Sequence, residues 1–370
     1  MPTQLIGPRL KALRDSRGLN QEAVADIFGF KDRQTVSAIE NGDRRLSADE
    51  LVRLVDALQV PLEYFTDPYR LEGEGSFSWR RSQDVPIDTL ESYEKIAGRW
   101  IAAFRVIAPQ VGGSAALLRH RLPLTKLSSF EEAMEAGERF VDEYQLGDVP
   151  ADALAKVMEE KLGILTLMVD GREGISGAAC RLPEIDAVLI NRYEVAGRRH
   201  FDLAHELFHI LTWDAMPPEH FEDAEARGRR SRVEQLADNF ASAVLMPRRL
   251  VADVDWKLLI DGNLIGTING KADELKVSSL ALKWRLVALD LLKRSQAQAI
   301  SDAALRHNGR VAPADDVVPP LFSHRFMIVL GSALDAGLLS LRRAAGLLDI
   351  DIDAMMRLFA EHGLEPPDEM

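Results

Sequence analysis

The sequence is poor in cysteine, has no excess of positive charge and lacks long apolar runs. Its single cysteine, Cys180, excludes an internal disulfide, which fits a reducing cytoplasm. No stretch approaches about 18 uninterrupted apolar residues, and no basic stretch leads into an apolar run at the N-terminus, so neither membrane insertion nor secretion is expected. The formal net charge of −13 argues against a protein that coats nucleic acid by bulk attraction. Any contact with DNA must come from a local basic surface.

The chain is long enough for several folded domains. Of its 370 residues, 46% are hydrophobic and 28% are charged, which is typical of folded proteins of two or three domains rather than of disorder. Amphipathic helices come first, then three strand-like stretches, "ILTLMV", "SGAACRL" and "DAVLIN", and then helices again. This order predicts an α+β fold. The expected domains are residues 1–70, 71–295 with a helical lead-in over 71–125, and 296–370.

The first seventy residues read as short helices separated by turn signals. "LNQEAVADIFGF" predicts a helix capped by Asn20 and closed by Gly29. "DRQTVSAIENG" predicts the next helix, from Asp32 to Gly42. Together these segments predict a small all-α domain.

The same segments resemble the Xre, phage-repressor-like helix-turn-helix family. The resemblance is carried by "NQEAVADIFGF", "TVSAIENG" and "LVRLVDALQVPLEYF". It implies that the third helix lies in the major groove of operator DNA. Because acidic residues lie beside this helix, we expect weak, salt-sensitive DNA binding that needs a homodimer. Arginine can pair with guanine, and glutamine with adenine. The matching positions for base contacts are Arg33, Gln34 and Ser37, and those for phosphate contacts are Asn41, Arg44 and Arg45.

A second interpretation of this region is a helical interaction module in which Arg33 and Gln34 are merely solvated. The acidic neighbours Asp32, Glu40 and Asp43 favour that alternative, because they would repel DNA phosphates.

A stretch in the middle of the chain has the spacing of a metal site. "GRRHFDLAHELFHILTW" is apolar enough to be a largely buried helix. His205 and His209 are four residues apart and therefore share a face. Two neutral imidazoles at this spacing can hold Zn²⁺, and Glu206 lies close enough to act as general base. A surface histidine pair beside an incidental glutamate is the alternative, and the apolar helix disfavours it.

A catalytic zinc site needs a third protein ligand. "RVEQLADNFASAVLMP" places Glu234 and Asp238 four residues apart on a second helix. One carboxylate could bind the metal while the other accepts a hydrogen bond from a ligand histidine.

Both stretches resemble the ImmA/IrrE family of zinc metallopeptidases, through "RRHFDLAHELFHIL" and "EQLADNFASAVLMP". The resemblance extends over roughly residues 90 to 295, and it implies a zincin-like peptidase domain with a regulatory protein as substrate. It also implies that the zinc ligands are His205, His209 and Glu234, with Glu206 catalytic. Phe208 stands where the family usually has glycine, and Leu236 stands where an acidic residue often precedes the alanine.

Cys180 has two interpretations. The resemblance implies that its strand runs near the cleft, where a thiolate could occupy the open zinc position and keep the enzyme latent. The alternative, which we favour, is a small buried residue.

Three functions remain open at this point. The first is a cytoplasmic regulator of a stress or mobile-element response that binds an operator and cleaves a partner repressor or itself. The second is a non-proteolytic transcription factor or antitoxin-like autoregulator that uses the peptidase fold as a metal or ligand sensor. The third, a general digestive peptidase, fits poorly with a DNA-binding domain. The helical C-terminus, with paired Arg342 and Arg343, is either a second DNA-binding element or, as we expect, a packing element.

Overall fold

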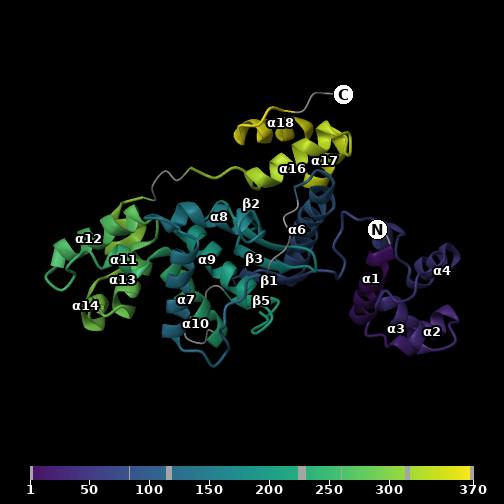
Figure 1. Ribbon diagram of the computed structural model, residues 1–370, viewed down its shortest axis with the longest axis horizontal. Coiled ribbons are helices and arrows are strands. Elements are labelled where there is room, and N and C mark those ends of the chain that lie inside the picture. The colour runs from purple at the N-terminus through teal and green to yellow at the C-terminus, as the bar shows by residue number, and fades with distance from the viewer. Residues whose placement is uncertain are drawn as a thin grey trace.

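A mixed β-sheet lies at the centre of the molecule (Figure 1). The computed structural model describes residues 3–82, 84–113, 119–223, 231–259, 261–312 and 317–366. Within these residues five strands pair in the order β2-β4-β3-β1-β5. They are β1 (Ser76–Arg81), β2 (Leu165–Val169), β3 (Ile175–Arg181), β4 (Asp186–Asn191) and β5 (Phe221–Asp223). The β4-β3-β1 pairings are antiparallel, whereas β2 with β4 and β1 with β5 are parallel. The predicted α+β class is confirmed.

Strand β1 corrects the sequence interpretation. A helical lead-in was expected over residues 71–125, but Ser76–Arg81 form a strand that pairs with β3, with Phe77 opposite Cys180 and Trp79 opposite Ala178. The local sequence carries little strand signal because the pairing partner lies about a hundred residues away, and such tertiary pairing overrides local preference.

The two faces of the sheet are covered by different helices. Ala179 and Val188 face a core built with α7 (Phe130–Glu143), α8 (Pro150–Glu160), α9 (Ala196–Thr212) and α10 (Arg232–Leu245). Their strand neighbours Ala178 and Leu189 face the opposite way, toward α6 (Ile87–Ile107) and the C-terminal helices. The alternation follows from the two-residue period of a strand.

The N-terminal helices gather at one end of the molecule (Figure 1). They are α1 (Thr3–Ser16), α2 (Gln21–Phe28), α3 (Arg33–Glu40), α4 (Ala48–Leu58) and α5 (Glu63–Thr66). Asn20 caps α2 by accepting a 2.7 Å hydrogen bond from the Ala23 amide, and Gly29 ends it at φ 65°. Asp32 caps α3 through the Thr35 amide. The predicted caps are confirmed.

A group of short helices lies at the other end (Figure 1). It comprises α11 (Arg248–Val251), α12 (Asp261–Glu274), α13 (Ser279–Ala288), α14 (Arg294–Ala299) and α15 (Asp302–Leu305). The buried Arg285 of α13 donates to the Met246 carbonyl at 3.0 Å and pairs with Glu138 at 2.5 Å, which fastens α13 to the end of α10 and to α7. None of the helices described has the length and apolar character needed to span a membrane.

The C-terminal helices α16 (His324–Asp335), α17 (Leu341–Leu348) and α18 (Ile352–Glu361) pack over α6 (Figure 1). Phe326 stacks on Phe104, and Trp100 donates to the Leu348 carbonyl at 3.4 Å. These contacts agree with the expected packing role.

A half-buried carboxylate, Glu159 at the end of α8, joins the C-terminal helices to the sheet domain. One oxygen of Glu159 accepts hydrogen bonds from the Ser323 hydroxyl at 2.6 Å and the Thr166 amide at 3.3 Å. Burial raises the pKa of Glu159 from 4.5 to about 6. Between these two values the folded state holds more protons than the unfolded chain, so the free energy of unfolding falls as the pH rises through this window.

We therefore expect Glu159→Gln to remove this pH dependence, because glutamine keeps the accepting oxygen but does not titrate. The free energy of unfolding of the variant minus that of wild type should therefore increase by up to about 2 kcal/mol from pH 4.5 to pH 7.5. Urea unfolding followed by tryptophan fluorescence at the two pH values measures it. Glu160→Gln, on the exposed neighbour, serves as control, and equal pH slopes in wild type and Glu159→Gln would contradict the assignment.

Candidate metal centre

One face of helix α9 carries the polar residues of the site. Asp202, His205, Glu206 and His209 recur at three- and four-residue spacing, which places them on one side of a helix. All four are at most 1% exposed. Apolar residues of α9 fill the core on the other sides. The predicted buried helix is present. Because its polar side chains are buried, they require hydrogen-bond or ion-pair partners from neighbouring elements.

Helix α10 brings the carboxylates. Ser231 caps it by accepting from the Glu234 amide, so Glu234 lies in the first turn. Helix α7 packs closely against α10 at Gly137, where a Cβ would lie 2.7 Å from the Phe240 carbonyl oxygen. Only glycine permits this approach. It fixes α10 against the core beside α9.

Three donor atoms converge between the two helices. His205 Nε2 lies 3.1 Å from His209 Nε2 and 3.1 Å from Glu234 Oε2, and His209 Nε2 lies 3.3 Å from Glu234 Oε1. A tetrahedral zinc ion with ligands at about 2.0–2.2 Å holds its donor atoms roughly 3.3–3.5 Å apart. Two imidazoles and a carboxylate also form a donor set that suits zinc better than magnesium or calcium. The residues fit a zinc ion.

Asp238 supports the site from behind. Its Oδ1 lies 3.1 Å from His205 Nδ1, so this ring nitrogen donates and the Nε2 lone pair is left for a metal. Burial and Arg80 lower the pKa of His205, but Glu234 and Asp238 outweigh them and raise it to about 10. The carboxylates thus favour a positive charge at this ring, which a metal ion would supply in place of a proton.

Arg80 of β1 is a site residue that the sequence analysis missed. Its guanidinium is 8% exposed and lies 3.2 Å from the Asp202 carboxylate. Asp202, Asp238, Glu206 and Glu234 all act electrostatically on Arg80. One arginine therefore neutralises part of the negative charge of the site. Asp202 was detectable, since it shares the helix face of His205, but nothing in "SFSWRR" marks Arg80.

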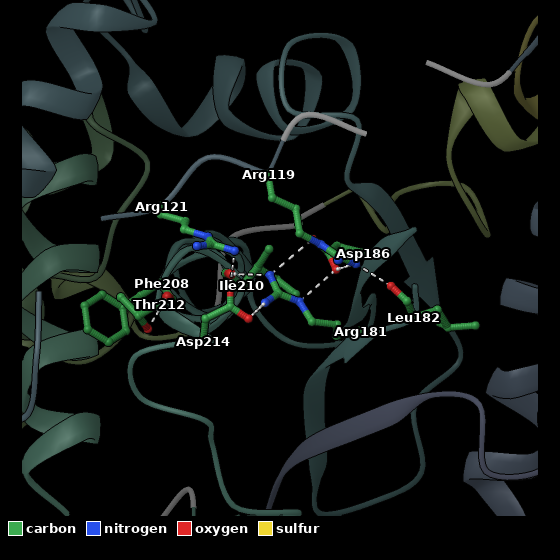
Figure 2. A network of polar contacts seen from close by, with 9 residues as sticks. All are labelled: Arg119, Arg121, Arg181, Leu182, Asp186, Phe208, Ile210, Thr212 and Asp214. Carbon is green, nitrogen blue, oxygen red and sulfur yellow. Dashed lines mark hydrogen bonds and ion pairs between the residues drawn. The ribbon is translucent and has the colours of Figure 1, made fainter. Parts of the chain in front are cut away.

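The C-terminal end of α9 is held by a second network (Figure 2). Arg181 donates to the Ile210 carbonyl at 2.9 Å and pairs with Asp186 at 3.0 Å and Asp214 at 3.1 Å. Arg119 also pairs with Asp186, at 3.2 Å. A cation at the C-terminal carbonyls of a helix is electrostatically favourable. The β3–β4 hairpin thereby fixes the end of α9 next to His209.

Comparison with known families agrees with both parts of this architecture. Residues 10–65 match the family model described as helix-turn-helix, and residues 159–286 match that of the IrrE N-terminal-like domain. The chain joins a helix-turn-helix domain to an IrrE N-terminal-like domain. None of the curated proteins matches the chain. The second match spans α9 and α10 with all the predicted metal residues, and this domain has a metallopeptidase-like fold. Arg80 lies outside it.

The geometry bears on the choice between Glu234 and Asp238. Glu234 lies at the converging donor atoms, whereas Asp238 contacts the far side of the His205 ring. Phe208 and Leu236, the two departures from the family pattern, are fully buried in the core, where Phe208 packs on Phe240. Both side chains therefore pack in the core, with the Phe208 ring edge-on to that of His209, and neither is one of the converging donors. The metal ligands themselves stay a prediction.

The idea that Cys180 could close the metal site is wrong. Cys180 is fully buried on the sheet face that packs against α6. Helix α9 covers the opposite face. Burial also raises the pKa of the Cys180 thiol, which disfavours a thiolate ligand. Strand β3 does run beside the site, but its side chains alternate between the two faces of the sheet, and that of Cys180 points away from α9.

The helix-turn-helix domain presents most of the predicted DNA contacts to solvent. Arg33 and Gln34 are exposed at the start of α3, and Ser37 is half-buried. Of the predicted phosphate contacts, Asn41 and Arg45 are exposed, whereas Arg44 pairs with Glu50 at 2.6 Å. The acidic Glu40 is buried against Arg14. One of the three charges that argued against DNA binding is therefore withdrawn from the surface.

Proposed function

We propose that the chain is a DNA-binding transcription regulator with a zinc-dependent peptidase domain. The peptidase would cleave a regulatory protein, either a partner repressor or the chain itself, in a stress or mobile-element response. The observation that carries the proposal is the convergence of His205, His209 and Glu234 donor atoms on the buried helix face that also holds Glu206. The fusion to a helix-turn-helix domain supports a regulatory rather than a digestive role.

The residues divide the chemistry between them. Zinc, when bound, would polarise the peptide carbonyl and lower the pKa of water in the site. The Glu206 carboxylate would take a proton from that water while the oxygen of the water attacks the carbonyl carbon. It would then deliver the proton to the amide nitrogen as the C–N bond breaks. Asp238 would keep the His205 ring in place throughout, and Arg80 would hold Asp202 one turn before Glu206.

A non-proteolytic metal or ligand sensor is the second candidate. The burial of Glu206 and both histidines favours it, because a peptide must reach Glu206 to be cleaved. Glu234 and Asp238, at 16% and 23% exposure of their side chains, mark the more open side of the site. A peptide would have to enter over α10.

The test combines metal analysis with mass spectrometry. The purified full chain should bind about one zinc per chain, since the site has one set of converging donors. The zinc-loaded protein should release fragments of itself or of a co-expressed neighbouring repressor. Failure to take up zinc would overturn the enzyme proposal, and zinc uptake without any cleavage would favour the sensor.

DNA binding through α3 leads to a separate prediction. If Arg33 reads a guanine, Arg33→Ala should weaken binding to a selected operator by about 1–3 kcal/mol and relax specificity at one base pair. Arg45→Ala should weaken binding to all sequences alike and reduce the salt slope by about one. Fluorescence anisotropy against salt concentration, with a DNA fragment selected from a random pool, measures both.

Arg139→Ala is the control, because this exposed arginine lies on α7 and belongs neither to the helix-turn-helix domain nor to the C-terminal helices. Equal losses on operator and unrelated DNA for Arg33→Ala would show that Arg33 makes no base contact.

A further inference from the structure

A cavity of about 810 Å³ lies between the helix-turn-helix domain and the sheet domain. One wall comes from α1, from the end of α3 and from the chain after α5. The other comes from the end of α6, from η1 (Ala108–Gln110) and from the turn between β3 and β4. The volume is in the range of pockets for small organic ligands. Much of the lining is apolar, from residues such as Leu5, Pro8, Ala12, Val106 and Pro109.

The packing around the cavity is specific. Arg9 of α1 is fully buried and donates to the carbonyls of Tyr64 and Arg70 at 2.8 and 2.7 Å, and to the Glu74 carboxylate at 2.9 Å. Gly73 has φ 87°, and a Cβ there would lie 2.1 Å from Ala12 Cβ. These contacts hold the segment before β1 tightly against α1, which fixes the first of the two cavity walls.

Arg105 of α6 is the polar group that points to a ligand. Its side chain is only 10% exposed, yet among the described residues its one hydrogen bond runs from Nη2 to the Pro68 carbonyl, at 3.2 Å. Its ion pair with Glu74 is long, at 3.8 Å, and Glu74 is already bound to Arg9. A guanidinium has five donors. Most of those of Arg105 are therefore available to the cavity that it lines.

The other charges on the walls are largely engaged. Glu40 and Asp15 both pair with Arg14, at 2.6 Å. Glu184 lies on the exposed β3–β4 turn at the rim, and the exposed Lys11 makes no ion pair within the described part of the chain. The negative charges of Glu74 and Glu184 would repel a ligand with two negative charges. A single carboxylate, in contrast, can accept two parallel hydrogen bonds from the Arg105 guanidinium.

We propose that this cavity is an effector site for a small organic monoanion, a carboxylate on an apolar chain or ring. The carboxylate would pair with Arg105 and the apolar body would lie against α1 and η1. The same cavity contacts Asn41 at the end of α3, and Pro183 in the hairpin that holds α9 through Arg181. A bound ligand would therefore contact both the end of α3 and the β3–β4 hairpin that holds α9. The proposal does not depend on peptidase activity.

Decanoate is a suitable probe, with decylamine and decanol as its cationic and neutral counterparts. In isothermal titration of the full chain, decanoate should bind once per chain, and the other two at least about tenfold more weakly, since a charge-assisted pair is lost. Arg105→Gln should weaken decanoate binding about tenfold or more. Val106→Trp, which narrows the cavity, should abolish it.

Arg342→Gln, an exposed arginine elsewhere, should leave decanoate binding unchanged. Circular dichroism checks that each variant is folded, and Arg105→Lys, which keeps the charge, stands in if Arg105→Gln does not fold and should lose less affinity than Val106→Trp. The proposal is overturned if decanoate does not bind at millimolar concentration, if decylamine or decanol binds as well, or if Val106→Trp binds like wild type.

Discussion

Glu206→Gln should bind zinc as wild type does and lose cleavage by about 10²- to 10⁴-fold, the range of general acid–base catalysis. Glutamine has nearly the size of glutamate and keeps one accepting oxygen, so the helix face and the converging donors of His205, His209 and Glu234 stay in place. What it cannot do is take a proton from water. Metal content by mass spectrometry, and the rate of fragment release under identical zinc loading, measure the two effects separately.

His209→Ala is the contrasting variant, because it should lose metal and cleavage together. Glu173→Gln, on an exposed turn, is the matched control and should change neither. Unchanged cleavage in Glu206→Gln would exclude Glu206 from the chemistry. Zinc binding without cleavage even in wild type would favour the sensor, for which the burial of Glu206 gives the physical reason.

The parts of the site predictable from the sequence are those encoded locally. The spacing of His205 and His209 on an apolar helix, and of Glu234 and Asp238 on a second one, follows from the 3.6-residue period. The caps at Asn20 and Asp32 are likewise set by residues three positions apart. The choice of Glu234 over Asp238 at the donor cluster needed the packing of α10 against α9.

The features of the site that could not be predicted from the sequence depend on pairing between distant strands. Arg80 reaches the metal site only because β1 pairs with β3, with Arg80 opposite Gly177. A six-residue strand with serines and arginines carries little periodic signal of its own. Cys180 shows the same limit, since β3 is buried on both faces and small residues alternate between them. Nothing in "SGAAC" tells which face a residue takes, and a shift of one residue would turn every side chain over.

Arg80→Met should destabilise the metal-free protein by about 3 kcal/mol, at the lower end of the cost of removing one partner from a buried ion pair. The Asp202 carboxylate is 1% exposed, and of its cationic partners in the described part of the chain it would keep only Arg198, whose side chain lies 3.6 Å away and is 41% exposed. A buried carboxylate with one distant, solvated partner is poorly compensated. Urea unfolding of the chelator-treated full chain measures the loss.

Arg198→Met provides the matched control for this pair. It removes an arginine from the same carboxylate but from a solvated position, where ion pairs are worth at most about 1 kcal/mol. Replacing both partners of the buried pair, Arg80→Met with Asp202→Leu, should recover much of the loss, because no buried charge is then left alone. Equal effects of Arg80→Met and Arg198→Met would show that β1 contributes no essential charge to the metal site. Added zinc should restore more stability to Arg80→Met than to wild type, because both cations neutralise the same carboxylates.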